Sequence, residues 1–114
     1  MDVLVEQDGD VLVATPIAKH LDLSNADSFR NEVVVALADG CKLVIDMERV
    51  EFVDSRGCGA IISCLKHLSA AGGDLKLCEV HPRVRTVFEL IRLHRICEIL
   101  DTRDQAIYSF ESHT

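Results

Sequence analysis

The chain has 114 residues, 48% of them hydrophobic and 27% charged, with a formal net charge of −7. These values predict a single globular domain, 1–114, built around one hydrophobic core. The acidic balance argues against nucleic acid as a partner, and no segment approaches the roughly 18 apolar residues of a membrane span.

The first residues, MDVLVEQDGD, have neither the basic start nor the apolar run of a secretion signal, so we expect a cytoplasmic protein. The five cysteines form no C-x-x-C pair and therefore indicate neither a disulfide framework nor a zinc site. We expect buried thiols in a reducing compartment, with no metal and no cofactor.

In the first half of the chain, two β-rich runs flank Asp8-Gly9, a turn pair that predicts an antiparallel hairpin. Ser24 is a good N-cap for a helix that Gly40 would end. A short apolar run without helical period follows and predicts a central strand that is buried on both faces. The predicted elements are strands 3–6 and 11–17, a helix over 24–40, and a strand over 42–47.

In the second half, apolar residues at helical spacing predict a helix that begins at or beside Ser55 and ends at Gly72-Gly73. Pro82 suits the first position of a third helix, and Thr102 with Gln105 has capping-box spacing before a short terminal helix. Two further strands are predicted over 74–80 and 98–100.

This alternation of strands and helices predicts an α/β fold with right-handed crossovers and a mostly parallel sheet. In such sheets, ligands and partners meet the loops at the carboxyl ends of the strands. The loop DSRGCG, residues 54–59, leaves a central strand and is therefore the candidate site.

Ser55 has three interpretations. It could cap the helix, although Asp54 could cap equally well. Gly57 and Gly59 weaken a helix and do not help a cap, so their presence must have another explanation, such as the close approach of another molecule.

A nucleophilic serine is the second interpretation, and the sequence disfavours it. The G-x-S-x-G pattern requires glycine where Val53 stands, and a cysteine-phosphatase pattern around Cys58 requires arginine where Cys64 stands. There is also no phosphate-binding P-loop motif. We therefore expect no catalytic residue.

The third interpretation is a phosphoacceptor. A phosphate on Ser55 would add about −1.5 to −2 units of charge. Four carboxylates lie near it in the sequence: Asp46, Glu48, Glu51 and Asp54. Such a change could release a bound partner by electrostatic repulsion alone.

The segment from VIDMERVEFVDSRGCG through Ala71-Gly72-Gly73 to the pattern of Val84, Phe88 and Leu93 resembles the STAS domains of anti-sigma factor antagonists. The resemblance covers nearly the whole chain. It implies the STAS fold, a mixed, mostly parallel β-sheet of four to five strands with about four α-helices packed on one face.

The resemblance also implies roles for individual residues. Ser55 matches the serine that a partner kinase of the GHKL type phosphorylates; this kinase is also the anti-sigma factor, and a PP2C-type phosphatase resets the serine. Asp22, in Leu21-Asp22, matches a second family aspartate, and its alternative is a turn role. The implied partner-binding residues are Asp22, Asp54, Ser55, Arg56, Gly57 and Gly59.

Arg56 departs from the family pattern, in which a small residue is commoner, and places a guanidinium beside the acceptor. An alternative function also follows from the resemblance, because STAS domains occur as small subunits of ABC-type lipid transport complexes. In that case the partner is an ATPase, and the hydroxyl serves contact instead of switching.

Overall fold

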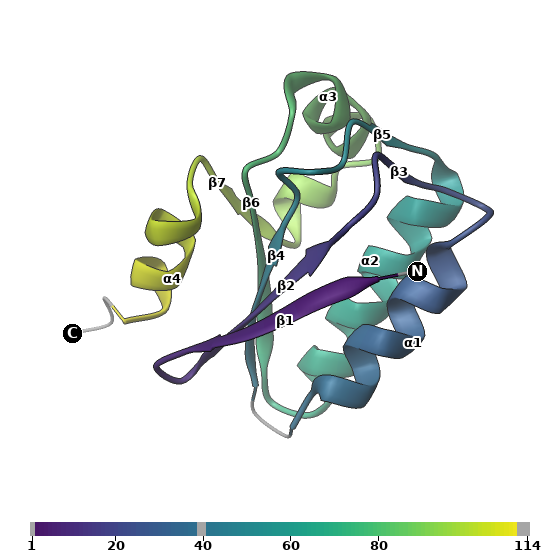
Figure 1. Ribbon diagram of the computed structural model, residues 1–114. Helices are drawn as coiled ribbons and strands as arrows, with labels where there is room; N and C mark the ends of the chain where they lie inside the picture. Colours follow the sequence, from purple (N-terminus) through teal and green to yellow (C-terminus); the bar gives the residue numbers. More distant parts are fainter. Residues whose placement is uncertain (1, 39–40, 112–114) are drawn as a thin grey trace.

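The computed structural model describes residues 2–38 and 41–111. Its main sheet has five strands in the order β1-β2-β4-β6-β7, and only the β1–β2 pair is antiparallel. The mixed, mostly parallel sheet that the sequence predicts is therefore confirmed (Figure 1). The strands are β1 (Val3–Asp8), β2 (Val11–Pro16), β4 (Lys42–Asp46), β6 (Asp74–Cys78) and β7 (Glu98–Leu100).

Within the described residues, four α-helices accompany the sheet, and two of them, α1 and α2, lie side by side against one of its faces (Figure 1). α3 lies across the end of the sheet, where a 3-10 turn, Leu93–Arg95, follows it. The largest buried side chains between helices and sheet include Phe29 from α1, Ile61 from α2 and Phe88 from α3. The helices are α1 (Ala26–Ala36), α2 (Ser55–Ala70), α3 (Pro82–Leu90) and α4 (Arg103–Glu111).

The expectation that all helices pack on one face is wrong for α4, which covers the opposite face (Figure 1). The reason is the two-sided burial of the central strands. Alternate residues of β2 and β4, such as Val13 and Val44, point away from α1 and α2 and would otherwise be exposed to water. α4 covers them with Ala106, Ile107 and Phe110.

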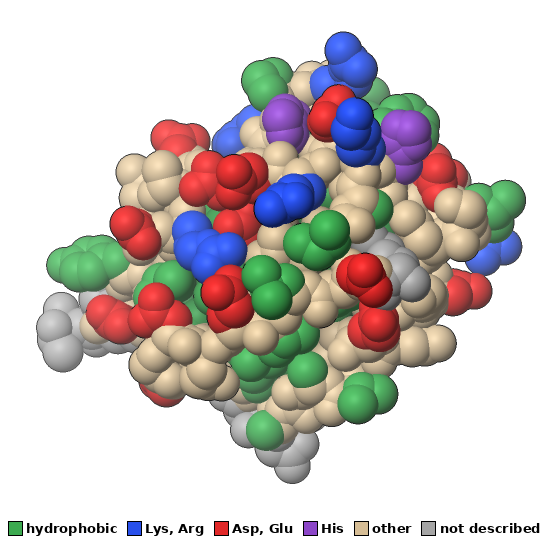
Figure 2. Space-filling model, viewed as in Figure 1, with side chains coloured by type: hydrophobic (Ala, Val, Ile, Leu, Met, Phe, Trp, Pro, Cys, Tyr) green, Lys and Arg blue, Asp and Glu red, His purple; other side chains and the backbone are tan. Residues whose placement is uncertain are grey.

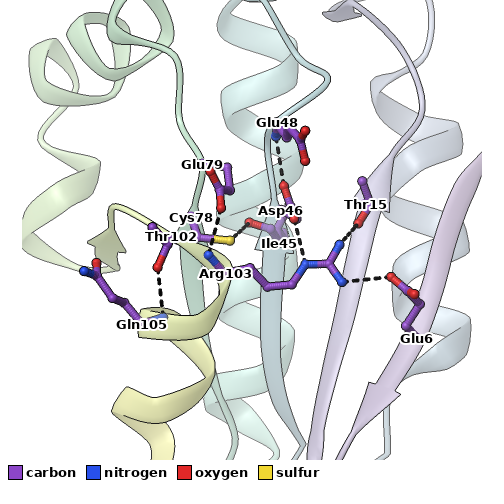
Figure 3. A network of polar contacts seen from close by, with 10 residues as sticks. All are labelled: Glu6, Thr15, Ile45, Asp46, Glu48, Cys78, Glu79, Thr102, Arg103 and Gln105. Atoms are coloured by element: carbon purple, nitrogen blue, oxygen red, sulfur yellow. Dashed lines mark hydrogen bonds and ion pairs between the residues drawn. The ribbon is translucent and has the colours of Figure 1, made fainter.

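Arg103, at the start of α4, fixes this helix to the sheet (Figure 3). Its Nε donates to the buried carboxylate of Asp46 at 2.9 Å, and its Nη1 donates to Glu6 at 2.9 Å. The backbone N–H of Arg103 donates to Glu79 at 3.0 Å. The predicted cap is also present, since Thr102 Oγ1 accepts from the N–H of Gln105 at 3.1 Å.

Several boundaries differ from the sequence predictions. The hairpin turn is Gly9-Asp10, one residue later than predicted, because Asp8 still pairs with Val11. The N-cap of α1 is Asn25 in place of Ser24, whose hydroxyl instead donates to Asp22. α1 ends at Ala36, and the predicted stop at Gly40 lies outside the described residues.

A second, two-stranded sheet was not predicted. It pairs β3 (His20–Leu21) with β5 (Phe52–Val53) in parallel. Two residues are too few to show a period of two in a sequence, so no pattern marks these strands. They matter for function because β3 leads into the loop of Asp22 and β5 leads directly into Ser55.

Candidate functional site

Ser55 is the first residue of α2, and its side chain is exposed. Asp54 is the N-cap, because its Oδ1 accepts from the N–H of Gly57 at 2.9 Å. Within the described part of the chain, no hydrogen bond involves the Ser55 hydroxyl. The capping interpretation of Ser55 is therefore wrong, and the hydroxyl is accessible to another protein.

Asp54 also joins two segments that are far apart in the sequence. Its Oδ2 accepts from the N–H of Leu23 at 3.1 Å, and its own N–H donates to the carbonyl of Leu21 at 3.3 Å. The loop after β3 is thus held against the N-terminus of α2. Asp54 is a positioning residue, since both of its carboxylate oxygens already have partners inside the chain.

Asp22 lies in the loop that Asp54 holds. Its Oδ1 accepts from the hydroxyl of Ser24 at 2.6 Å and from the N–H of Ser24 at 3.0 Å. These two hydrogen bonds lower the pKa of Asp22 below its ordinary value, with the hydroxyl as the larger cause. The structure thus places this aspartate beside the start of α2, and it also gives Asp22 the turn role that the sequence left open.

The two glycines have different surroundings. A Cβ on Gly57 would lie 2.2 Å from the carbonyl oxygen of Leu21, so the absence of a side chain allows β3 and α2 to approach each other. Gly57 is buried, and this contact inside the fold explains why the position is a glycine. Gly59 is exposed, and no atom lies within 4 Å of a Cβ built on it. Of the two glycines, only Gly59 is therefore compatible with the predicted close approach of another molecule.

Arg56 is exposed next to Ser55. Among the residues that the structure describes, its guanidinium takes part in no ion pair. A free guanidinium can form bidentate hydrogen bonds with a carboxylate or a phosphate, so Arg56 is available to a partner or to a modified serine.

The thiol chemistry considered for Cys58 does not fit its surroundings. The side chain is buried, and this burial, followed by the nearby Asp54 carboxylate, raises the pKa of its thiol. A raised pKa suppresses the thiolate that a cysteine nucleophile needs. No cluster of potential metal ligands occurs within 2–38 and 41–111, and no helix there is long and apolar enough to cross a membrane.

Two apolar side chains near Ser55 were missed in the sequence. Leu23 is 69% exposed in the loop held by Asp54, and Phe52 is 46% exposed on β5. The ring of Phe52 contacts His20 edge to face, with centroids 5.8 Å apart. β5 exposes Phe52 and buries Val53, but a strand of two residues is too short for this alternation to be recognised in the sequence.

The site thus combines an accessible hydroxyl, a free guanidinium and two exposed apolar side chains at the carboxyl ends of β3 and β5. It has no nucleophile activated by a base in the described residues, and its lining resembles a protein-binding surface more than a substrate pocket.

Comparisons with known proteins indicate the family to which the chain belongs. The family model described as "STAS domain" matches residues 2–106. The chain is 30% identical over 83 residues to the anti-sigma-B factor antagonist of Bacillus subtilis, covering 73% of this chain and 76% of that protein. It is 26% identical over 113 residues to the anti-sigma F factor antagonist of Paenibacillus polymyxa, covering 97% and 96%.

Among solved structures, the fold resembles the Bacillus anti-sigma factor antagonist SpoIIAA in its unphosphorylated form, with a TM-score of 0.79, 23% identity and 99% of each chain covered. The phosphorylated form of SpoIIAA gives a TM-score of 0.70 at 23% identity, with 96% and 99% covered. The family model spans nearly the whole chain, and the chain therefore belongs to the STAS domain family.

Proposed function

We propose that this STAS domain is a cytoplasmic anti-sigma factor antagonist that phosphorylation of Ser55 switches off. In the unphosphorylated state it binds an anti-sigma factor, a serine kinase of the GHKL type, and thereby frees the sigma factor. Phosphorylation by that kinase releases the antagonist, and a PP2C-type phosphatase resets it. The protein itself is not an enzyme in this proposal.

The observation that carries the proposal is the exposed, unbonded hydroxyl of Ser55 on a helix that Asp54 already caps. Because the cap does not depend on Ser55, a phosphate can be added without removing any hydrogen bond of the described fold. The N-terminus of α2 also favours negative charge, so the modified domain stays folded.

The proposed release is electrostatic. A phosphate adds about −1.5 to −2 charge units. Leu23 is held against Asp54, and Phe52 lies three residues before Ser55, so a partner that covers these exposed apolar groups would have to bury that charge against apolar surface. A charge that is buried without a compensating partner costs about 3–5 kcal/mol, which lowers an affinity by a hundredfold or more.

The test uses the cognate kinase, ATP and three forms of the protein. The native chain should gain one phosphate at Ser55 by mass spectrometry, and Ser55→Ala should gain none while still binding the kinase. Ser55→Asp should bind at least tenfold more weakly, although one unit of charge imitates a phosphate only partly.

Phosphate incorporation that is undiminished in Ser55→Ala would refute the assigned acceptor. A native chain that stays unmodified and co-purifies with an ATP-binding-cassette protein would instead support the transport-subunit alternative. Ser63→Ala on the same helix is the matched control and should behave like the native chain, because Ser63 lies two turns further along α2.

A further inference from the structure

A second exposed surface lies where α3 ends, and it takes no part in the site around Ser55. Leu90 is 78% exposed, Ile91 46% and Ile96 59%. Arg92 and Arg95 are exposed between them, and the buried Leu93 anchors the turn in the core. We call the five exposed residues, Leu90, Ile91, Arg92, Arg95 and Ile96, the arginine patch.

The charge of this region is opposite to that of the whole chain. Residues 82–95 hold four arginines and one acid, whereas the chain has a net charge of −7. Figure 2 shows several Lys and Arg side chains gathered toward the end of the molecule where α3 lies, while the acids are spread across the middle of this face.

The acids nearest to the patch in the sequence already have partners. Glu89 pairs with Arg85 at 3.4 Å, and Glu98 pairs with Lys76 at 3.2 Å. Among the residues of the described ranges, neither Arg92 nor Arg95 forms an ion pair. Two guanidinium groups are therefore free beside three exposed aliphatic side chains.

Arg92 also adopts a backbone conformation that is unfavourable for it. Its φ of 62° and ψ of 30° lie in the left-handed region, which glycine occupies without cost and arginine does not. This conformation ends α3 and begins the 3-10 turn, because the N–H of Arg92 donates to the carbonyl of Glu89 at 3.0 Å and its carbonyl accepts from the N–H of Arg95 at 3.1 Å. Glycine would fit this turn with less strain, so the turn does not require the arginine side chain, which has no ion-pair partner among the described residues.

We propose that the arginine patch binds an acidic, amphipathic segment of a protein partner. Carboxylates of that segment would pair with Arg92 and Arg95, and its apolar face would cover Leu90, Ile91 and Ile96. The free guanidinium groups define the complementary charge. Arginine is enriched in protein interfaces and lysine, which this patch lacks, is depleted there, while the buried centre of an interface is more apolar than its rim.

An anionic membrane has similar chemistry, and the charge of the chain disfavours it. A net charge of −7 repels an anionic surface as a whole, and the patch offers only two unpaired cations. A single protein segment can reach the patch without approaching the acidic remainder of the molecule.

The experiment titrates the full, ¹⁵N-labelled chain with a synthetic 18-residue peptide that has leucine and glutamate at amphipathic helical spacing. Amide shifts should concentrate in residues 90–96. Arg92→Gly should weaken peptide binding at least tenfold while its melting temperature is unchanged or raised, because the substitution removes backbone strain. Lys66→Gln, an equal loss of charge at an exposed position of α2, should bind like the native chain.

A peptide with glutamine in place of each glutamate should bind at least tenfold more weakly, since the proposal requires carboxylates. Equal binding by the two peptides, equal binding by Arg92→Gly and Lys66→Gln, or shifts spread evenly over the surface would overturn the proposal. Binding to phosphatidylglycerol vesicles that is lost in Arg92→Gly, without binding of the peptide, would assign the patch to a membrane and also overturn it.

Discussion

Two glycines, two positions apart on α2, meet different surroundings and should respond differently to the same substitution. In Gly57→Ala the new Cβ meets the backbone carbonyl of Leu21, which cannot rotate away. We expect a loss of about 1–3 kcal/mol in the free energy of unfolding, typical of overpacking. Gly59→Ala has open space and should gain up to about 1 kcal/mol from helix propensity.

Urea unfolding of the two variants and the native chain measures this difference. The variants serve as each other's control, because both add one methyl group to the same helix. A Gly57→Ala variant as stable as Gly59→Ala would show that β3 and α2 are not held as closely as the structure indicates.

Asp22 provides a prediction about protonation. Its pKa is lowered chiefly by the Ser24 hydroxyl, so Ser24→Ala should raise this pKa toward the ordinary value of 3.8. A carboxyl with a lowered pKa contributes stability that is present above its unfolded-state pKa, about 3.9, and is lost as pH falls through the folded-state value. Any effect of Ser24→Ala on stability through Asp22 is therefore absent under strongly acidic conditions.

An NMR titration of the Asp22 carboxyl carbon measures the shift directly. Ser24→Thr keeps the hydroxyl and should keep the pKa low. An identical pKa in the native chain and in Ser24→Ala would show that the hydroxyl does not hold the carboxylate.

An ion-pair network at the start of α4 joins this helix to the sheet. Arg103→Met removes the cation beside Asp46, whose side chain is 2% exposed. An uncompensated buried charge costs about 3–5 kcal/mol, so this variant should be strongly destabilised in urea. Adding Asp46→Asn should recover part of the loss, because it removes the unpaired charge.

The exposed Arg85–Glu89 pair is the matched control for Arg103. Pairs of this kind contribute about 0.5 kcal/mol or less, so Arg85→Met should be nearly neutral. A loss for Arg103→Met as small as that for Arg85→Met would contradict the role of the network in holding α4.

The elements differ in how well the sequence predicts them, and the physical cause is the length over which each pattern repeats. α2 has sixteen residues and buries side chains at helical spacing from Gly57 to Leu68, so its start at or beside Ser55 could be predicted. β3 and β5 have two residues each and show no period. The sequence predicted that β4 is buried on both faces, which requires a helix on each side of the sheet. The prediction of a single helical layer did not take this into account, and α4 covers the second face.

Only the part of the site that is local in the sequence could be predicted. The motif marks Ser55 and Asp54 because they are adjacent in the sequence. The bond from Leu23 to Asp54 joins residues 31 positions apart, and the contact of Gly57 with Leu21 is equally non-local. Such contacts depend on how β3 and β5 pair, and local patterns contain no information about that pairing.

The charge of the whole molecule bears on how fast the proposed kinase partner associates. A chain with a net charge of −7 attracts a basic surface, and salt screens that attraction. We expect the association rate constant for the kinase to fall about tenfold between 50 mM and 500 mM salt, with a smaller change in the dissociation rate constant. Stopped-flow fluorescence over this range measures both.

The position of the charge should matter as well as its sum. Glu51 precedes Phe52 near the site, whereas Asp8 ends β1 at the hairpin, on the far side of a molecule 38 Å long. With a Debye length of about 10 Å at 0.1 M salt, Glu51→Gln should slow association more than Asp8→Asn, although both remove one exposed negative charge. Equal effects would mean that only net charge guides the encounter, and faster association of Glu51→Gln would mean that the partner presents an acidic surface here.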